Sequence, residues 1–146
     1  MKINIAEAVR CEGESFSADV SGSFDGIDFL GESYKFPAGA KVGANWRFDG
    51  QGVIVSGDFS ADIAVRCARC LEEFVYRLDF NFVEYYKKQP EEGVYAYGGE
   101  SIDLSQMLED NVVINLPTRF ICREECKGLC GRCGANLNEN ECGCKL

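Results

Sequence analysis

The sequence predicts an α+β fold that is mainly antiparallel β, as a sheet or partial barrel, with one main helix and a C-terminal cysteine-rich zinc-binding tail. Three features of the 146-residue chain favour this fold. Short stretches of alternating apolar and polar residues run as far as residue 86, and one stretch with helical spacing follows near residue 104. The last 25 residues then contain six of the nine cysteines. Strands that follow one another without helices between them typically pair antiparallel.

The first strands are expected within residues 1–60, where apolar and polar residues alternate at 3–5 and 16–20. The dipeptide Asp25-Gly26 stands between apolar residues and indicates a hairpin turn. A second hairpin is predicted around Asp49-Gly50-Gln51-Gly52, because this turn sequence separates two short apolar runs.

Two longer strands are predicted next. Residues 59–65 form a run that leads directly into Cys67, and residues 74–86 alternate regularly. The apolar side chains of this second run should share one face: Phe74, Tyr76, Leu78, Phe80 and Phe82. Residues 87–100 are expected to form an exposed loop.

One helix is predicted over residues 103–115. Asp103 can cap its first turn, with Gln106 three residues later as in a capping box, and Pro117 prevents further helix. Apolar residues recur at helical spacing on one face, which we expect to pack in the core. These residues are Leu104, Met107, Leu108 and Val112.

Two structural units are expected: a β-rich body over residues 1–118, which includes the helix, and a zinc-binding tail over residues 119–146 packed on it. From Phe120 onward large apolar residues are few, and glycine and asparagine are frequent. Such a tail cannot bury enough apolar surface to fold alone, so it needs a cross-link or a metal.

Composition excludes several classes of function. The chain has no histidine, which removes Ser-His-Asp and Cys-His nucleophiles, and it has no phosphate-binding loop or recognisable carboxylate motif. We therefore expect a protein that is not an enzyme and has no small-molecule substrate. No run reaches the roughly 18 apolar residues of a membrane span, and the first ten residues lack the features of a signal peptide. We expect a cytoplasmic protein, or one in an organelle after loss of a transit peptide.

The cysteines are the strongest chemical signal. Eight of the nine fall into four short pairs, and this spacing suits metal ligands better than disulfides in a chain without an export signal. The candidate ligands are Cys67, Cys70, Cys122, Cys126, Cys130, Cys133, Cys142 and Cys144. Eight thiols make two four-sulfur zinc sites, and such closed sites are structural rather than catalytic. The cysteine runs of ferredoxins are absent, and a thioredoxin-like pair would need a βαβ context that the sequence lacks.

Which pairs share a metal is open between two schemes. In the first, Cys67 and Cys70 join Cys122 and Cys126, while the last two pairs form a small ribbon-like site. In the second, all the zinc lies in the tail, and the pair at residues 67 and 70 is free or redox-active. The single spacer between Cys142 and Cys144 is short for one metal, so these two could also divide between sites. Cys11 lies in a predicted strand and is expected to be a buried small apolar residue.

Charge limits the choice of partner. The chain has a formal net charge of −9, and residues 91–116 carry six acidic and no basic side chains. Such a chain should repel phosphate backbones in general, whereas its acidic stretch could either be solvated or bind a basic protein. Six basic residues flank the cysteines: Arg66, Arg69, Arg119, Arg123, Lys127 and Arg132. They could screen the thiolates, or form a local rim that contacts RNA or an acidic partner.

These segments resemble the YceD family. The sequence Cys67-Ala68-Arg69-Cys70-Leu71 resembles its C-x-R-C-L signature, and Ile102-Asp103-Leu104 with Leu116-Pro117 resembles its helix region. Residues 126–138 with Cys142-Gly143-Cys144 are similar to its cysteine-rich tail, C-K-G-L-C-x-x-C-G-x-x-L-N followed by C-x-C. The resemblance runs from about residue 60 to the end of the chain.

The resemblance implies a metal-binding bacterial and plastid family that supports accumulation of large-subunit ribosomal RNA. It implies ribosomal RNA or a basic large-subunit ribosomal protein as the partner. The expected function is thus a non-catalytic zinc-binding factor of ribosome biogenesis. The alternative is a thiol redox or zinc-release sensor, because Arg66 and Arg69 lie beside the first cysteine pair.

Overall fold

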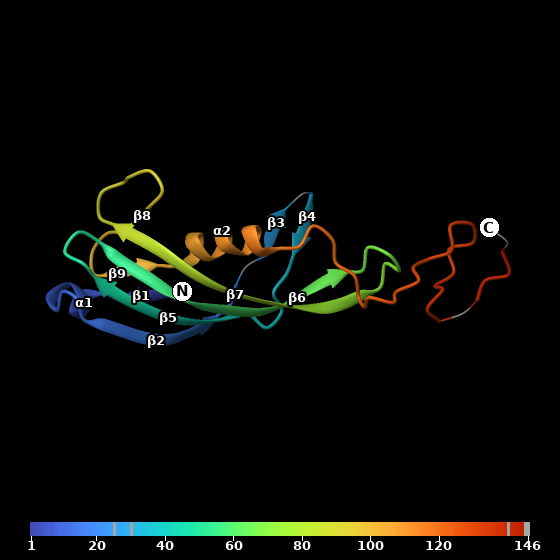
Figure 1. Cartoon of the computed structure of the whole chain (residues 1–146), viewed down its shortest axis with the longest axis horizontal. Coiled ribbons are helices and arrows are strands. Elements are labelled where there is room, and N and C mark those ends of the chain that lie inside the picture. Colours follow the sequence, from blue (N-terminus) through green and yellow to red (C-terminus); the bar gives the residue numbers. More distant parts are fainter. Residues whose placement is uncertain (25, 30, 140, 145–146) are drawn as a thin grey trace.

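The computed structural model describes residues 1–24, 26–29, 31–139 and 141–144. Asp25 of the predicted Asp-Gly turn and residues 140, 145 and 146 of the predicted tail lie outside the described residues. In chain order the elements are β1 (Lys2–Asn4), α1 (Ala6–Arg10), β2 (Ser15–Gly22), β3 (Ile27–Phe29), β4 (Glu32–Tyr34), β5 (Ala40–Phe48), β6 (Val53–Arg66), β7 (Glu73–Lys87), β8 (Tyr95–Ala96), β9 (Ser101–Asp103) and α2 (Ser105–Asn115) (Figure 1).

The main structural unit is a five-stranded sheet with the strand order β2-β5-β6-β7-β8. Its first four strands pair antiparallel, and only the short β8 runs parallel to its neighbour. Two small antiparallel pairs, β1 with β9 and β3 with β4, accompany it. The strand pairings of the described residues leave the sheet open rather than closed into a barrel. The predicted α+β, mainly antiparallel fold is therefore confirmed.

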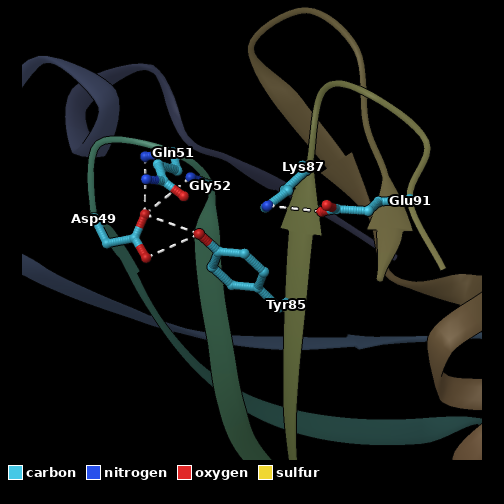
Figure 2. A network of polar contacts seen from close by, with 6 residues as sticks. All are labelled: Asp49, Gln51, Gly52, Tyr85, Lys87 and Glu91. Carbon is cyan, nitrogen blue, oxygen red and sulfur yellow. Dashed lines mark hydrogen bonds and ion pairs between the residues drawn. The ribbon is translucent and has the colours of Figure 1, made fainter. Parts of the chain in front are cut away.

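The hairpin between β5 and β6 forms where the sequence predicted it. Phe48 pairs with Val53, and residues 49–52 make the turn. The Asp49 carboxylate accepts hydrogen bonds of 2.9 Å from the backbone N–H groups of Gln51 and Gly52, and the Tyr85 hydroxyl also donates to it (Figure 2). The turn is thereby connected to β7, two strands away from β5.

The predicted alternation in β7 is confirmed. Leu78, Phe80 and Phe82 are buried on one face, and Phe74 and Tyr76 on the same face are half-buried. The residues between them are exposed. One face of the sheet thus covers the core, and the other faces solvent.

The predicted helix forms as α2 and lies along the sheet (Figure 1). Its predicted apolar face is fully buried, as expected: Leu104, Met107, Leu108 and Val112 are 0% exposed. The helix begins at Ser105, slightly after its expected start at about residue 103, because Asp103 pairs with Lys2 in the β1–β9 ladder. Asp103 still accepts the backbone N–H of Ser105 at 3.0 Å, but Gln106 bonds to Asp110, so the predicted capping box does not form.

Some local predictions outside the main sheet are wrong. The strand expected at residues 3–5 ends at Asn4, because Ile5 leads into α1, and Cys11 lies at the end of this helix rather than in a strand. The hairpin expected at Asp25-Gly26 includes a residue outside the described ones, and the nearby hairpin that the structure describes joins β3 to β4. Among residues 87–100, which are mostly exposed as expected, Tyr95 and Ala96 form β8.

The cysteine-rich end extends from the sheet beyond the turn that joins β6 to β7 (Figure 1). Phe120 connects it to the body: its backbone carbonyl accepts the N–H of Ala68 at 2.7 Å, and its ring packs edge-on to Tyr76. No helix among the described residues is both long and apolar enough to span a bilayer.

Candidate metal centres

The structure gathers eight cysteines into two groups of four. The first group is Cys67, Cys70, Cys122 and Cys126, and the second is Cys130, Cys133, Cys142 and Cys144. Within each group all four sulfurs lie within 4.8 Å of one another, so either group could hold a metal ion.

The first group connects two distant parts of the chain. Cys67 and Cys70 lie in the turn after β6, and Cys122 and Cys126 lie in the segment that follows α2. The sulfurs of Cys67 and Cys126 are 3.7 Å apart, and those of Cys70 and Cys122 are 3.8 Å apart. A tetrahedral zinc ion with sulfurs about 2.3 Å away requires separations of about 3.8 Å. The cysteines are unbonded to one another, so this group has the dimensions of a four-sulfur zinc site.

Backbone N–H groups point at the first cysteine of this group. The N–H groups of Arg69 and Cys122 each lie 3.4 Å from the Cys67 sulfur. Burial alone would raise the pKa of Cys67, but hydrogen bonds from the backbone of Cys70, Cys122 and Arg69 lower it to about 6. This arrangement stabilises the thiolate, which is the form that binds a metal.

The second group repeats this local geometry. Backbone hydrogen bonds from Cys133 and Arg132 lower the pKa of Cys130 to about 6, and the N–H of Arg132 lies 3.4 Å from its sulfur. Contact with Cys133, together with burial, raises the pKa of Cys144 to about 12. Four thiols this close cannot all ionise unless a cation lies between them. Both groups therefore require a metal before all four thiolates can form.

The residue after each Cys-x-x-Cys pair adopts a left-handed backbone. Gly134, which follows Cys133, has φ = 74°, as expected for a glycine beside a metal turn. Leu71, which follows Cys70, has φ = 62° although it carries a side chain, and that side chain is 53% exposed. This conformation costs a non-glycine residue about 1–2 kcal/mol.

Asn138 lies in the sequence between the two cysteine pairs of the second group, and its side chain contacts the first group. Its side-chain amide lies 3.3 Å from the Cys126 sulfur, and its side-chain oxygen accepts the backbone N–H of Lys127 at 2.8 Å. The N–H of Leu137 reaches the carbonyl of Gly128 at 2.9 Å. No pattern in the sequence placed Asn138 in contact with a cysteine; the signal that was missed is an amide side chain placed between two cysteine pairs.

The grouping of the cysteines is the first of the two schemes that the sequence left open. Cys67 and Cys70 lie against Cys122 and Cys126 rather than alone, and Cys142 and Cys144 fall in the same group. Cys11 belongs to neither group and is half-buried.

The six basic residues near the cysteines are all exposed, but they differ in role. The guanidinium of Arg69 donates to the backbone carbonyls of Cys126 at 3.0 Å and Glu124 at 3.3 Å, so it holds the tail to the turn after β6. Arg66 lies 3.7 Å from Glu73. Four others form no ion pair with any described residue: Arg119, Arg123, Lys127 and Arg132.

Comparison with known proteins identifies the family. The family described as large ribosomal RNA subunit accumulation protein YceD matches residues 55–146, which include both cysteine groups. The chain belongs to the YceD family. The predicted resemblance is therefore confirmed over more than half of the chain.

The curated relatives of this chain share only part of their length with it. An uncharacterized protein of Mycobacterium tuberculosis is 34% identical over 95 residues, which are 60% of this chain and 46% of the relative. The chloroplastic large ribosomal RNA subunit accumulation protein YCED homolog 1 of Arabidopsis thaliana is 42% identical over 45 residues, which are 31% of this chain and 14% of the relative. The maize protein of the same name is 40% identical over 47 residues, 32% of this chain and 16% of its own. The chain thus spans about half the length of these relatives or less, and no solved structure matches it.

Proposed function

We propose that this protein is a non-catalytic zinc-binding factor that supports ribosome biogenesis. The observation that carries the zinc assignment is the geometry of the first cysteine group, whose sulfurs lie at tetrahedral separations of 3.7 and 3.8 Å. Sets of four thiolates favour zinc, and a closed set leaves no coordination position for water or substrate. Bound zinc would supply cross-links: one within the tail, and one between the tail and the turn after β6.

The ribosomal part of the proposal rests on the family. The YceD family and its chloroplast members are described by large ribosomal RNA subunit accumulation. We propose the same role for this chain, exerted in the cytoplasm. The zinc sites would keep a binding surface in shape rather than take part in a reaction.

The proposed direct contact is a basic large-subunit ribosomal protein. The chain has a net charge of −9, and each zinc with four thiolates adds a centre of formal charge about −2. Both charges attract a basic protein and repel an RNA backbone. Ribosomal RNA is the second candidate, and its contacts would be four cations that form no ion pair with a described residue: Arg119, Arg123, Lys127 and Arg132.

A thiol redox or zinc-release sensor is supported by one specific observation. Cys133 is exposed, unlike its partner Cys130, so an oxidant can reach the second group directly. This function requires that mild peroxide release zinc reversibly and change partner binding. Zinc retention under peroxide concentrations that oxidise free thiols would rule it out.

Zinc binding is tested by native mass spectrometry of protein purified under reducing conditions without added metal. We expect two zinc ions, one zinc in Cys70→Ser, and two in the matched control Cys11→Ser. One zinc or none in the unsubstituted protein contradicts two structural sites.

The ribosomal role is tested by depleting the protein and measuring ribosomal RNA of both subunits. Large-subunit RNA should fall relative to small-subunit RNA. Cys11→Ser should restore it, and Cys70→Ser should not. Unchanged large-subunit RNA after depletion contradicts the role.

A further inference from the structure

The long strand β7 has one edge that is almost entirely unpaired. On one side β7 pairs with β6 from Glu73 to Tyr86. On the other side β8 pairs only with Tyr86 and Lys87. Among the described strands none pairs with residues 73–85 on this side, which is an open edge about 40 Å long. We call residues 73–85 on this side the β7 edge.

The backbone groups at the β7 edge belong to its odd-numbered residues. In an antiparallel ladder, successive residues turn their N–H and C=O groups alternately toward the partner strand and away from it. Near the turn, the carbonyl of Glu72 accepts the N–H of Cys67 from the β6 side. At the other end, the carbonyl of Lys87 accepts the N–H of Tyr97 from the β8 side. Both contacts assign odd-numbered residues from 73 to 85 to the open edge, so a row of donors and acceptors faces outward.

This edge lacks several of the features that usually prevent strand addition, although it carries charged side chains such as Arg77 and Asp79. Natural edge strands are commonly short or carry proline, lysine or a bulge. The register of β6 with β7 is continuous from residue 73 to residue 86, without a bulge, and residues 73–85 contain no proline or lysine. Two of the outward positions are Val75 and Val83, which are 62% and 71% exposed and favour extended structure. The opposite edge strand, β2, has only 8 residues.

The surroundings of the β7 edge have an excess of negative charge. Arg77 lies between two acids, 3.4 Å from Asp62 and 3.3 Å from Asp79. At the two ends of the edge, Arg66 and Lys87 are each paired with a glutamate. Helix α2, which contacts β7, carries two acidic side chains and no basic one. Arg66, Arg77 and Lys87 beside the edge are thus each paired with an acid, and of the cations next to it Lys88, which follows β7, forms no ion pair with a described residue.

We propose that the β7 edge binds an extended segment of a basic polypeptide, which adds to the sheet as a further strand. Backbone hydrogen bonds to the odd-numbered residues would supply affinity, and basic side chains of the segment would meet the acidic groups around the edge. The proposal deepens the proposed function, on which it rests for the identity of the partner as a basic protein. It places the contact on β7 and away from the basic residues beside the cysteines.

A second copy of this chain fits the edge less well. Two edges paired antiparallel about their midpoint would place Val75 opposite Val83 of the other copy, which is favourable, but they would also place the two Asp79 side chains opposite each other. Each copy also carries a net charge of −9. A basic segment avoids both repulsions.

The test uses an acetylated peptide of about ten residues in which lysine alternates with threonine and valine. Hydrogen exchange of the full, metal-loaded protein should slow at the odd-numbered amides of β7 when the peptide is added. The same peptide with glutamine in place of lysine should bind at least tenfold more weakly. Unchanged exchange along β7, or protection confined to residues 119–132, overturns the proposal.

Variants separate strand addition from simple charge attraction. Asn81→Pro removes an outward N–H without touching the β6 ladder and should weaken peptide binding at least tenfold. If this variant does not fold, the pair Val75→Lys and Val83→Lys should weaken binding similarly. The matched control, Ser17→Lys with Ser21→Lys on β2, adds the same charge and should change binding less than threefold. Equal weakening by the control overturns the proposal, as does concentration-dependent dimerisation that protects the same amides without peptide.

Failure of the edge proposal and failure of the ribosomal role can be told apart. If depletion lowers large-subunit RNA and Asn81→Pro restores it fully, the role stands and the edge proposal is wrong. If depletion leaves the RNA unchanged, the ribosomal role is wrong, and the peptide measurements alone decide whether the edge binds a basic strand.

Discussion

The body and the cysteine-rich end of this protein are held together by different forces. In the body, aromatic rings pack in the core. The rings of Phe59 and Phe80 are stacked with their centroids 4.7 Å apart, and those of Phe24 and Phe36 pack edge-on with centroids 4.8 Å apart. Beyond Phe120, the buried side chains among the described residues belong to Cys126 and Cys130. Burial of apolar area stabilises the first region, whereas the second has little such area and depends on its thiols. We therefore expect the body to lose stability when apolar burial is reduced, and the cysteine-rich end to unfold when its metal is removed.

Metal removal should separate the two regions most clearly. A strong chelator at neutral pH should abolish amide protection from residue 121 onward while β5, β6 and β7 keep theirs, because structural zinc contributes about 10–16 kcal/mol to small domains that lack a core. Hydrogen exchange with mass spectrometry measures this. Cys11→Ser should respond to chelator as the unsubstituted protein does. Loss of protection in the body at the same rate as in the tail contradicts the division.

A cavity in the core of the body should lower the stability of the body and leave zinc binding unchanged. Phe59 is 1% exposed, so Phe59→Ala should lower the free energy of unfolding by about 3–5 kcal/mol. Urea denaturation, monitored by the fluorescence of Trp46, measures the decrease in the free energy of unfolding. Zinc content of the folded variant should stay at two ions. Ile114→Ala, at a side chain 77% exposed, is the control and should change stability by less than about 0.5 kcal/mol. Loss of zinc from folded Phe59→Ala would show that the regions are coupled.

The same contrast explains what the sequence could predict of the fold. The alternation in β7 and the apolar face of α2 are patterns repeated over many residues. Such a pattern indicates one buried face, and it therefore predicts the secondary structure. The conformation of single residues was set by strand pairing with residues far away in the sequence. Asp103 has a good capping side chain, but pairing with Lys2 draws it into a strand. Likewise, β2 pairs with β5 instead of with the segment that follows it, which no local signal indicates.

The candidate metal centres were more predictable than the fold. Short cysteine spacings place both sulfurs of a pair on one turn, and only the association of pairs needed the structure. Contacts from other residues were not predictable in this way. The side-chain amide of Asn138 contacts the sulfur of Cys126, which lies 12 residues earlier in the sequence. Leu71 adopts a left-handed backbone conformation, which leucine does not favour. Neither follows from a local pattern.

Within the body, two neighbouring tyrosines provide a smaller test. The Tyr86 hydroxyl is buried and has no hydrogen-bond partner among the described residues, whereas the Tyr95 hydroxyl donates to Asp110 at 2.7 Å. Tyr86→Phe should raise the free energy of unfolding by about 1 kcal/mol, because it removes an unsatisfied polar group, and Tyr95→Phe should lower it by about 1 kcal/mol. Chemical denaturation at neutral pH measures both. A loss of stability in Tyr86→Phe contradicts the assignment.

The smallest expected effect lies around Asp49 (Figure 2), at the end of the sheet away from the two cysteine groups (Figure 1). Hydrogen bonds from the backbone N–H groups of Gln51 and Gly52 and from the Tyr85 hydroxyl lower the pKa of Asp49. Because the folded-state pKa lies below the unfolded value of about 3.9, the carboxylate stabilises the fold above that pH and loses this effect as the pH falls through the folded-state pKa. Asp49→Asn should therefore lower stability by about 0.5–1 kcal/mol at pH 7, and the difference from the unsubstituted protein should shrink in acid. Denaturation curves across this pH range measure it, with Asp19→Asn on β2 as the control. A difference that stays constant into acid would mean that Asp49 acts through its shape and not through its charge.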